Sequence, residues 1–331
     1  MFPRIALLLA VTASAAFALS EERLNQTLDV TSGGKLVVDV GFGTIEIAPG
    51  VDNQVKIEAE RKIETSDEAK EKQFLSNSPI VVSKEGNTVI ISARCSEEKG
   101  SWTWTGNTRM DARYTVRVPK NFNLDLKTGG GTVSAKEITG EVKISTSGGK
   151  LKLAQLRGPV DARTSGGSIK IEDCQGTLGV KTSGGEIRSE AGSGSLDART
   201  SGGSIVVRDF KGDTTVKTSG GQLTFANIGG KVIGHTSGGS ISAALTSPIA
   251  GEVELTSSAG SIDLTIPADA ALTLEADASN GTVSNSLPIV ATHTERDELR
   301  GAMNGGGKSV ILRSSVGSIS LRPSPPKTAM Q

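Results

Sequence analysis

A positively charged side chain repeatedly stands immediately before a glycine-rich tetrapeptide in the middle of the chain. The tetrapeptide is TGGG at Thr128 and TSGG from Thr146 onward, and each copy begins 18 residues after the last. The residues in front of it are Lys127, Ser145, Arg163, Lys181, Arg199, Lys217 and His235. Side chains of one sign at one spacing can bind a polymer of the opposite charge, such as an acidic polysaccharide. The alternative is a solvated charged face, in which Asp161 and Asp197 neutralise part of the column.

Two further groups of side chains could contact a ligand. The stretch from Ser101 to Gly106 holds both tryptophans of the chain, Trp102 and Trp104, between charged flanks. Tryptophans at the tip of a loop can stack on a sugar or a partner, and the alternative is that they cover an open end of the core. The serines of the TSGG tetrapeptides form a second column, and we interpret them first as turn-forming residues.

The residue types that catalysis and metal binding require are scarce. His235 and His293 are the only histidines, and neither lies in a spacing typical of zinc sites. Glu172 and Asp173 form a carboxylate pair like those of solenoid enzymes that cleave polysaccharides, but short coils leave no long loops to build a cleft. We therefore expect a protein that is not an enzyme, with no catalytic residues, no metal and no cofactor.

The fixed spacing also predicts the elements that position these columns. After each tetrapeptide the chain alternates apolar and polar residues, reaches a single glycine such as Gly158, and alternates again. Such runs are typical of half-buried strands, and an unbroken period is typical of stacked repeats. We expect an all-β fold, a single continuous parallel β-helix (β-solenoid) with 18-residue coils. Glycine at both corners would adopt positive φ, and the threonine of each tetrapeptide would face inward in a hydrogen-bonded ladder.

The repeat divides the chain into four parts. We assign 1–20 to a signal peptide, 21–127 to irregular β-rich coils that cap the solenoid, 128–322 to the regular repeats and 323–331 to a disordered tail. A capping box at Thr65–Glu68 predicts a short helix from about Ser66 to Phe74, with strands from Lys35 onward. A second short helix is predicted over Thr294–Met303, where the period has loosened.

The first residues have the pattern of a secretory signal. Arg4 supplies a positive charge, Ile5–Ala13 is apolar, and Ala16–Ala18 offers a cleavage site. The apolar run is shorter than the roughly 20 residues that a membrane span needs, so we expect cleavage and export to the periplasm or the cell surface. Export permits a disulfide between Cys95 and Cys174, but Cys174 occupies an apolar repeat position and is interpreted as a small buried side chain.

Several segments carry a family resemblance. They are Tyr114–Pro119, Asn123–Gly131 with the TSGG array after it, and Leu299–Gly301 with Asn304–Gly307 and Val310–Leu312 near the end. These segments resemble the bacterial putative-adhesin family of β-strand repeat proteins and, more distantly, the head-GIN domain proteins. The resemblance implies an exported right-handed β-solenoid with no catalytic residues to carry over, and it implies no particular ligand.

Composition sets further bounds on function. The chain has 36 lysines and arginines and 36 aspartates and glutamates, so its formal net charge is zero. No overall electrostatic field therefore favours binding to nucleic acid or to an anionic membrane. We expect an exported, non-enzymatic, adhesin-like binding module at the cell envelope, which binds an acidic polysaccharide or an envelope protein. The alternatives are a structural scaffold that assembles with its own copies and a degenerate carbohydrate-active solenoid enzyme. Neither the ligand nor the oligomeric state follows from the sequence.

Overall fold

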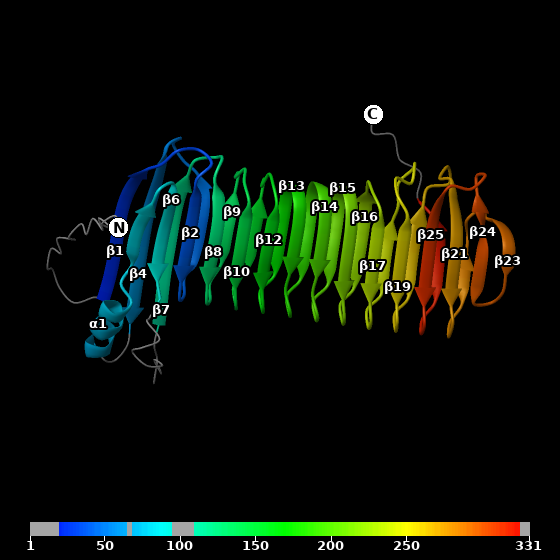
Figure 1. Ribbon diagram of the computed structural model, residues 1–331. Helices are drawn as coiled ribbons and strands as arrows, with labels where there is room; N and C mark the ends of the chain where they lie inside the picture. Colours follow the sequence, from blue (N-terminus) through cyan, green and yellow to red (C-terminus); the bar gives the residue numbers. More distant parts are fainter. Residues whose placement is uncertain (1–19, 65–67, 95–108, 325–331) are drawn as a thin grey trace, which may run out of the picture.

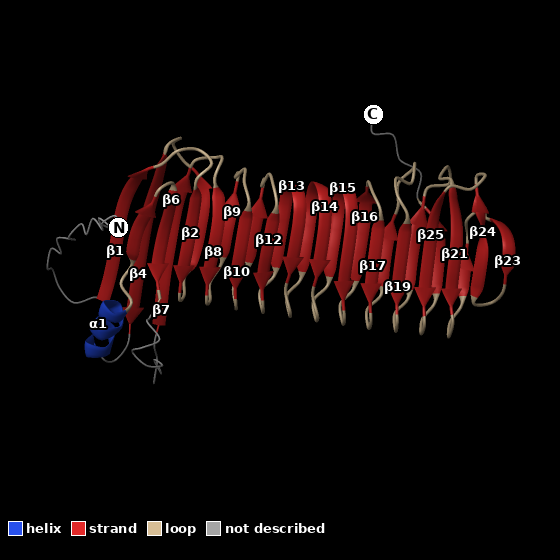
Figure 2. Ribbon diagram, viewed as in Figure 1, coloured by secondary structure: helices blue, strands red, loops and turns tan. Residues whose placement is uncertain are grey.

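The chain forms one long stack of strands that runs from end to end of the molecule (Figures 1 and 2). The computed structural model describes residues 20–64, 68–94 and 109–324. Within them the strands are numbered β1 to β26, and α1 (Glu68–Asn77) is the one helix of the described residues. The prediction of an all-β fold is confirmed.

Each coil of the regular array contributes two straight segments, one before the tetrapeptide and one after it. We call the stack of the first segments the leading ladder and the stack of the second segments the trailing ladder. The leading ladder contains β8 (Asn123–Thr128), β10 (Val142–Thr146), β12 (Val160–Thr164), the later halves of β13 (Ile169–Lys181), β14 (Ile187–Arg199) and β15 (Ile205–Thr218), then β17 (Val232–Thr236) and β19 (Val253–Ser257). The trailing ladder contains β9 (Val133–Lys136), β11 (Leu151–Ala154), the first halves of β13 to β15, then β16 (Leu223–Ile228), β18 (Ile241–Ala244) and β20 (Ile262–Ile266).

Register in both ladders follows the sequence period. Strands pair in parallel, and Val142 lies opposite Val160 just as Leu151 lies opposite Ile169, so partners are 18 positions apart. Alternate side chains point inward: Val142 and Ile144 are buried, whereas the side chains between and after them are exposed. Burying one such aliphatic side chain contributes about 1.5–3 kcal/mol, and the contribution recurs in every coil.

The last glycine of each TSGG tetrapeptide is required by stacking rather than by its φ angle, whereas Gly131, the last glycine of TGGG, has a φ of 116°. A Cβ on Gly167 would lie 1.9 Å from the carbonyl oxygen of Gly149 in the preceding coil, and the backbone of neither residue has positive φ. The expectation of positive φ is met instead at the opposite corner, where Gly158 and Gly176 have φ of 127° and 131°. Only one of the two corners therefore uses the conformational freedom of glycine, and the other uses its small size.

A column of non-glycine residues in the left-handed region adjoins that opposite corner. Its members are Glu137, Gln155, Asp173, Ala191, Asp209 and Asn227, with φ between 46° and 58°. Alanine tolerates this conformation less well than asparagine, whose side chain bonds to nearby backbone. Ala191→Asn is therefore expected to raise the free energy of unfolding by about 1 kcal/mol. Denaturant unfolding tests this, with Ser193→Asn, at a position without positive φ, as a control that should show no gain.

The N-terminal end is closed by antiparallel strands and the helix. β2 (Lys35–Val40) and β3 (Thr44–Pro49) form a coil in phase with the array, next to β8 and β9. Outside that coil lie β6 (Thr88–Ala93) and β7 (Arg109–Val118), and the end is closed by β5 (Val81–Glu85), β4 (Gln54–Glu64) and β1 (Ser20–Asp29). β4 and β5 run antiparallel to their neighbours, which ends the parallel ladders.

A partly buried ion pair lies under the helix at this end. The guanidinium of Arg61 is fully buried, pairs with Glu22, and lies 3.4 Å from Ser78 Oγ and 5.9 Å from the centre of the Phe74 ring. Phe74 and Ser78 come from α1 and the residue that follows it, so the helix covers the open core at this end. The predicted helix is thus observed at Glu68–Asn77, with residues 65–67 of its predicted cap outside the described ranges.

The C-terminal end has a coil out of sequence order. β25 (Lys308–Ser314) pairs with β19 on one side and with β21 (Leu272–Ala278) on the other. β26 (Ile319–Pro323) likewise lies between β20 and β22 (Val283–Asn285). In Figure 1 the red strand β25 stands between yellow β19 and orange β21. The last strands of the described chain are therefore internal.

The second predicted helix, over Thr294–Met303, is wrong. This stretch forms the end of β23 (Val290–Thr294) and the whole of β24 (Glu298–Met303), which run antiparallel to each other, and β24 pairs with β21. Leu299, Gly301 and Met303 are buried with the period of a strand. The residues of this stretch have a weak preference for a helix. Pairing with an existing sheet edge outweighs that preference here, because tertiary context overrides weak local propensity.

Candidate functional site

The basic column is brought together as one line of side chains on the leading ladder. Lys127 pairs with Ser145, Ser145 with Arg163, and the register continues through Lys181, Arg199, Lys217 and His235. All occupy the last outward position before the tetrapeptide, and all except His235 are exposed. Neighbouring strands lie about 4.8 Å apart, so this line places one side chain in every strand spacing.

Three of the five arginine and lysine side chains in this line are paired with a carboxylate of their own coil. Arg163 makes two hydrogen bonds of 3.0 and 2.9 Å to Asp161, and Arg199 makes two of 2.8 Å to Asp197. The hydrogen bond from Arg199 to Asp197 raises the pKa of that guanidinium above its ordinary value. Lys127 lies 3.9 Å from the carboxylate of Asp125. These cations are therefore held by carboxylates two residues earlier on the same strand.

Lys181 and Lys217 alternate with the paired arginines and have no such carboxylate. The residues two positions before them are Gly179 and Thr215, and in the described part of the chain neither lysine forms an ion pair of 4.0 Å or less. Both ammonium groups are thus exposed and lie outside the ion pairs of the column. Gly179, two residues before Lys181, has no side chain, whereas the equivalent positions before the arginines carry aspartates.

This two-coil alternation was not part of the sequence prediction, although the sequence contains it. Asp161, Gly179, Asp197 and Thr215 occupy equivalent positions in successive coils. Comparing each cation with the residue two places before it would have separated the neutralised positions from the free ones. From the sequence we expected that Asp161 and Asp197 could neutralise part of the column, but we did not distinguish Lys181 and Lys217 from the arginines.

The threonines of the tetrapeptides form the predicted inward ladder, and their bonds join neighbouring coils. Thr182 Oγ1 donates to the carbonyl oxygen of Gly167 at 2.9 Å and accepts from the N–H of Gly185 at 3.2 Å. The same two bonds recur at Thr164 and Thr218. The serine after each threonine is exposed, and its backbone carries the corner: Ser183 N donates to Ser165 O at 3.0 Å.

Removing one of these inward hydroxyls is expected to destabilise the array. Thr182→Val keeps the shape of the side chain but leaves a buried carbonyl and a buried N–H without their partner. The expected loss is about 1–3 kcal/mol in the free energy of unfolding. Denaturant titration measures it, and Thr182→Ser, which retains the hydroxyl, should lose clearly less. If both variants lost the same free energy of unfolding, the loss would come from side-chain packing and not from the hydroxyl.

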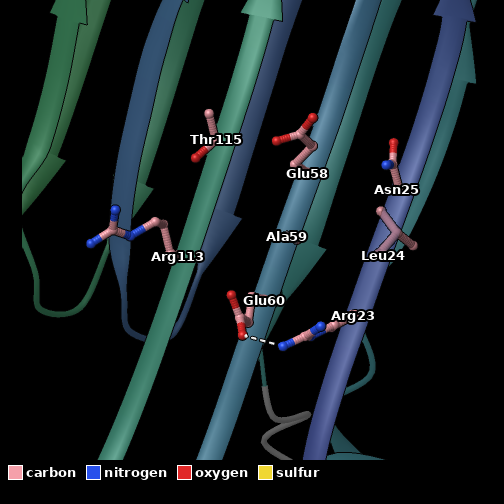
Figure 3. Close-up of a pocket in the computed structure, with 8 residues that line it drawn as sticks. All are labelled: Arg23, Leu24, Asn25, Glu58, Ala59, Glu60, Arg113 and Thr115. Carbon is pink, nitrogen blue, oxygen red and sulfur yellow. Dashed lines mark hydrogen bonds and ion pairs between the residues drawn. The ribbon is translucent and has the colours of Figure 1, made fainter.

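A shallow groove lies on the outward face of the three antiparallel N-terminal strands. It has a volume of about 460 Å³ and is lined from β1, β4 and β7, with Thr115 and Asn25 among the longer charged side chains (Figure 3). Its charges are largely satisfied locally, because Arg23 lies 3.1 Å from Glu60 and Arg113 lies 3.7 Å from Glu46. The mixture of paired charges gives this groove no evident preference for a ligand.

The tryptophans and cysteines singled out in the sequence lie away from the cationic column or outside the described residues. Trp102, Trp104 and Cys95 lie outside the described residues, so their contact with a ligand stays a prediction. Cys174 is a free, fully buried cysteine, and burial raises the pKa of its thiol. Among the described residues, no cluster of three or more His, Cys, Asp or Glu side chains could hold a metal ion. No helix of the described residues is long and apolar enough to cross a membrane.

Fold and site together define a β-solenoid repeat protein with a linear cationic column on one face. The family description Toastrack DUF4097 matches residues 34–226, which is more than half of the chain. The chain belongs to the Toastrack DUF4097 family, and its resemblance to the putative-adhesin β-repeat proteins is confirmed. No curated protein matches the chain.

Solved structures from three bacteria are similar to the chain. A putative cell adhesion protein of Clostridium sporogenes ATCC 15579 is 12% identical, with a TM-score of 0.22 over 92% of this chain and 100% of that one. A putative adhesin of Bacteroides fragilis NCTC 9343 is 13% identical, with a TM-score of 0.32 over 91% and 97%. A putative lipid binding protein of Parabacteroides distasonis ATCC 8503 is 10% identical, with a TM-score of 0.30 over 92% and 97%.

Proposed function

We propose that this chain is an exported, non-enzymatic binding module of the cell envelope that holds an acidic polysaccharide along the leading ladder. The observation that carries the proposal is the alternation of free lysines with neutralised arginines. Lys181 and Lys217 are the lysines of this column that form no ion pair in the described part of the chain, while Arg163 and Arg199 each make two hydrogen bonds to an aspartate. The proposal includes a right-handed winding, which parallel β crossovers favour, and a location in the periplasm or at the cell surface.

The spacing of the free lysines suits a polymer ligand whose anionic groups are separated along its length. Lys181 and Lys217 are two strand spacings apart, or about 10 Å. An anionic group on alternate units of a polymer could meet each ammonium in turn. The intervening pair of Arg199 and Asp197 adds planar polar groups without net charge. Gly179 has no side chain, so a sugar ring could lie close to the strand at that position.

Physical arguments disfavour the two alternatives. A scaffold that grows by stacking end on end needs open parallel edges, whereas β4 and β5 at one end and β24 and β23 at the other are antiparallel. An enzyme needs a cleft, and the shallow groove on β1, β4 and β7 has little of the depth that such sites have. An envelope protein with an acidic strip is the other partner that the same charges would accept.

A charge-matched set of variants tests the binding site. Lys181→Ser with Lys217→Ser is expected to weaken binding to an acidic polysaccharide about tenfold at low salt, since each exposed charge contact is worth up to about 1 kcal/mol. The matched control removes both ion pairs together, with Asp161, Arg163, Asp197 and Arg199 all changed to Ser. It deletes the same number of cations but no net charge, and its affinity should be nearly unchanged.

A second variant tests the mechanism without removing a lysine. Gly179→Asp with Thr215→Asp gives each free lysine the carboxylate that its neighbours have, and a Cβ at Gly179 meets nothing closer than 3.7 Å. Binding is expected to fall as far as in the lysine variant. Affinities are measured by titration against an acidic polysaccharide and a neutral one, at two salt concentrations. Equal affinity in the lysine variant, its control and the unchanged protein would rule out this site.

A further inference from the structure

The C-terminal coil, residues 308–323, is bound on both edges along its length. Its inward side chains Val310, Leu312 and Ile319 are fully buried. On one edge Val316 N donates to Ser258 O at 2.9 Å, and on the other Ser279 N donates to Ser314 O at 3.0 Å. The coil fills a slot whose walls are β19 with β20 on one side and β21 with β22 on the other.

The two walls of this slot are already in register with each other. Val310 pairs with both Val253 and Leu274, so these two wall residues share one column and lie 21 positions apart. The preceding step of the ladder, from Val232 to Val253, is also 21 positions. In the trailing ladder Ile262 and Val283 are again 21 apart, through Ile319.

Direct stacking of β21 and β22 on β19 and β20 would therefore continue the array with an unchanged step. Inward-facing residues of the two walls would then lie opposite each other. The backbone at Gly281 would contact that at Gly260, whereas both now contact Gly317, which lies between them. Such stacking would pair the two walls of the slot with each other, so that neither wall's slot-facing edge would be left unpaired after the C-terminal coil had left.

The connection into the coil is a short clasp. Asn304–Gly307 passes over the end of β21, because Met303 and Lys308 both pair with Leu272. Asn304, Gly305 and Gly306 have φ of 50°, 83° and 86°. Asn304 Nδ2 donates to the carbonyl oxygens of Ala268 and Ala270, both at 2.9 Å. These bonds tie the clasp to the loop that joins the two walls.

We propose that residues 308–323 are a separable donor coil, which leaves its slot while the array stays folded and which the same coil of a second copy can replace. When the coil leaves, β21 and β22 would pair directly with β19 and β20 in place of β25 and β26. The partner is a second copy of this chain, because the slot demands two short strands with the inward pattern Val-x-Leu-x-Ser and Ile-x-Leu. This goes beyond polysaccharide binding, which uses other coils.

Hydrogen exchange on the unchanged full-length protein tests the release. The amides of β25 and β26 are expected to exchange at a lower free energy of opening than those of β21, which pair again after release. Fraying from the end gives the opposite order, since β21 is further from the array than β25. Exchange of β21 before β25, or exchange of both only with global unfolding, would overturn the proposal.

Binding in trans tests the replacement. In full-length protein with Leu312→Asp, the chain's own coil cannot be buried, and a labelled peptide of residues 308–323 is expected to bind saturably. The same peptide carrying Leu312→Asp should not bind, and Asn304→Ala in the otherwise unchanged protein should speed uptake of the native peptide several-fold. If the Leu312→Asp protein keeps β13 to β15 protected from exchange yet binds no peptide, replacement is excluded. Should this variant fail to fold, uptake by the Asn304→Ala protein decides in the same way.

Discussion

Gly185→Ala is expected to lower the free energy of unfolding by about 3 kcal/mol or more, at the severe end of single substitutions. A Cβ at this position would lie 1.9 Å from the carbonyl oxygen of Gly167 and 2.4 Å from its carbonyl carbon. Both are backbone atoms, so no change of rotamer can relieve the overlap. The two coils must separate locally, which strains the parallel hydrogen bonds and the bonds of Thr182 to Gly167 and Gly185.

The neighbouring glycine of the same tetrapeptide provides the control. A Cβ at Gly184 would have nothing within 4 Å, and the φ of this residue is not in the left-handed region. Gly184→Ala should therefore stay within about 0.5 kcal/mol of the unchanged protein. Denaturant midpoints of the two variants, followed by circular dichroism, measure the difference. Similar midpoints would show that the corner can yield, and that close stacking does not explain the repeated glycine.

The sequence predicted most of the fold because one period acts in every coil. A shift of one residue would turn Val142 and Ile144 outward, so parity alone determines register. The same reasoning placed Thr182 inward and Lys181 outward. It failed at the second glycine of the corner pair, because the distance between stacked backbones is a property of neighbouring coils. A residue pattern within one coil cannot reveal that distance.

At the ends of the solenoid the sequence predicted the helix α1 but not how the strands pair. β1 was not predicted, since its partner β4 is an antiparallel strand with no period in common with the array. The insertion of β25 beside β19 could not be inferred either, because β21 has the sequence step of an ordinary next coil. At the candidate site the sequence placed the column of cations. The neutralised positions also follow from the spacing, because Asp161 and Asp197 stand two residues before Arg163 and Arg199, and the structure adds the hydrogen bonds that join them.

Phe225→Ala is expected to cost about 3–5 kcal/mol of stability, because the ring crosses the core to fill a space that the opposite ladder leaves open. Phe225 belongs to the trailing ladder and is 2% exposed. A Cβ on Gly234 in the leading ladder would lie 2.9 Å from its Cε2 and Cζ atoms. Other coils place Val216 or Leu255 at the position of Gly234. The large ring and the missing side chain are therefore complementary, and the alanine variant would leave a cavity.

A double-mutant cycle separates this complementarity from the general cost of a smaller side chain. Gly234→Val alone should also destabilise, by about 1–3 kcal/mol, since it crowds the ring. Combined with Phe225→Ala, the valine occupies part of the vacated space and restores the side chain that Val216 supplies one coil earlier. The double variant is therefore expected to be more stable than the sum of the single losses by at least about 1 kcal/mol. Additive losses would mean that the two ladders pack independently. A positive coupling would show that substitutions in one ladder constrain those tolerated in the other, although the repeats look interchangeable in sequence.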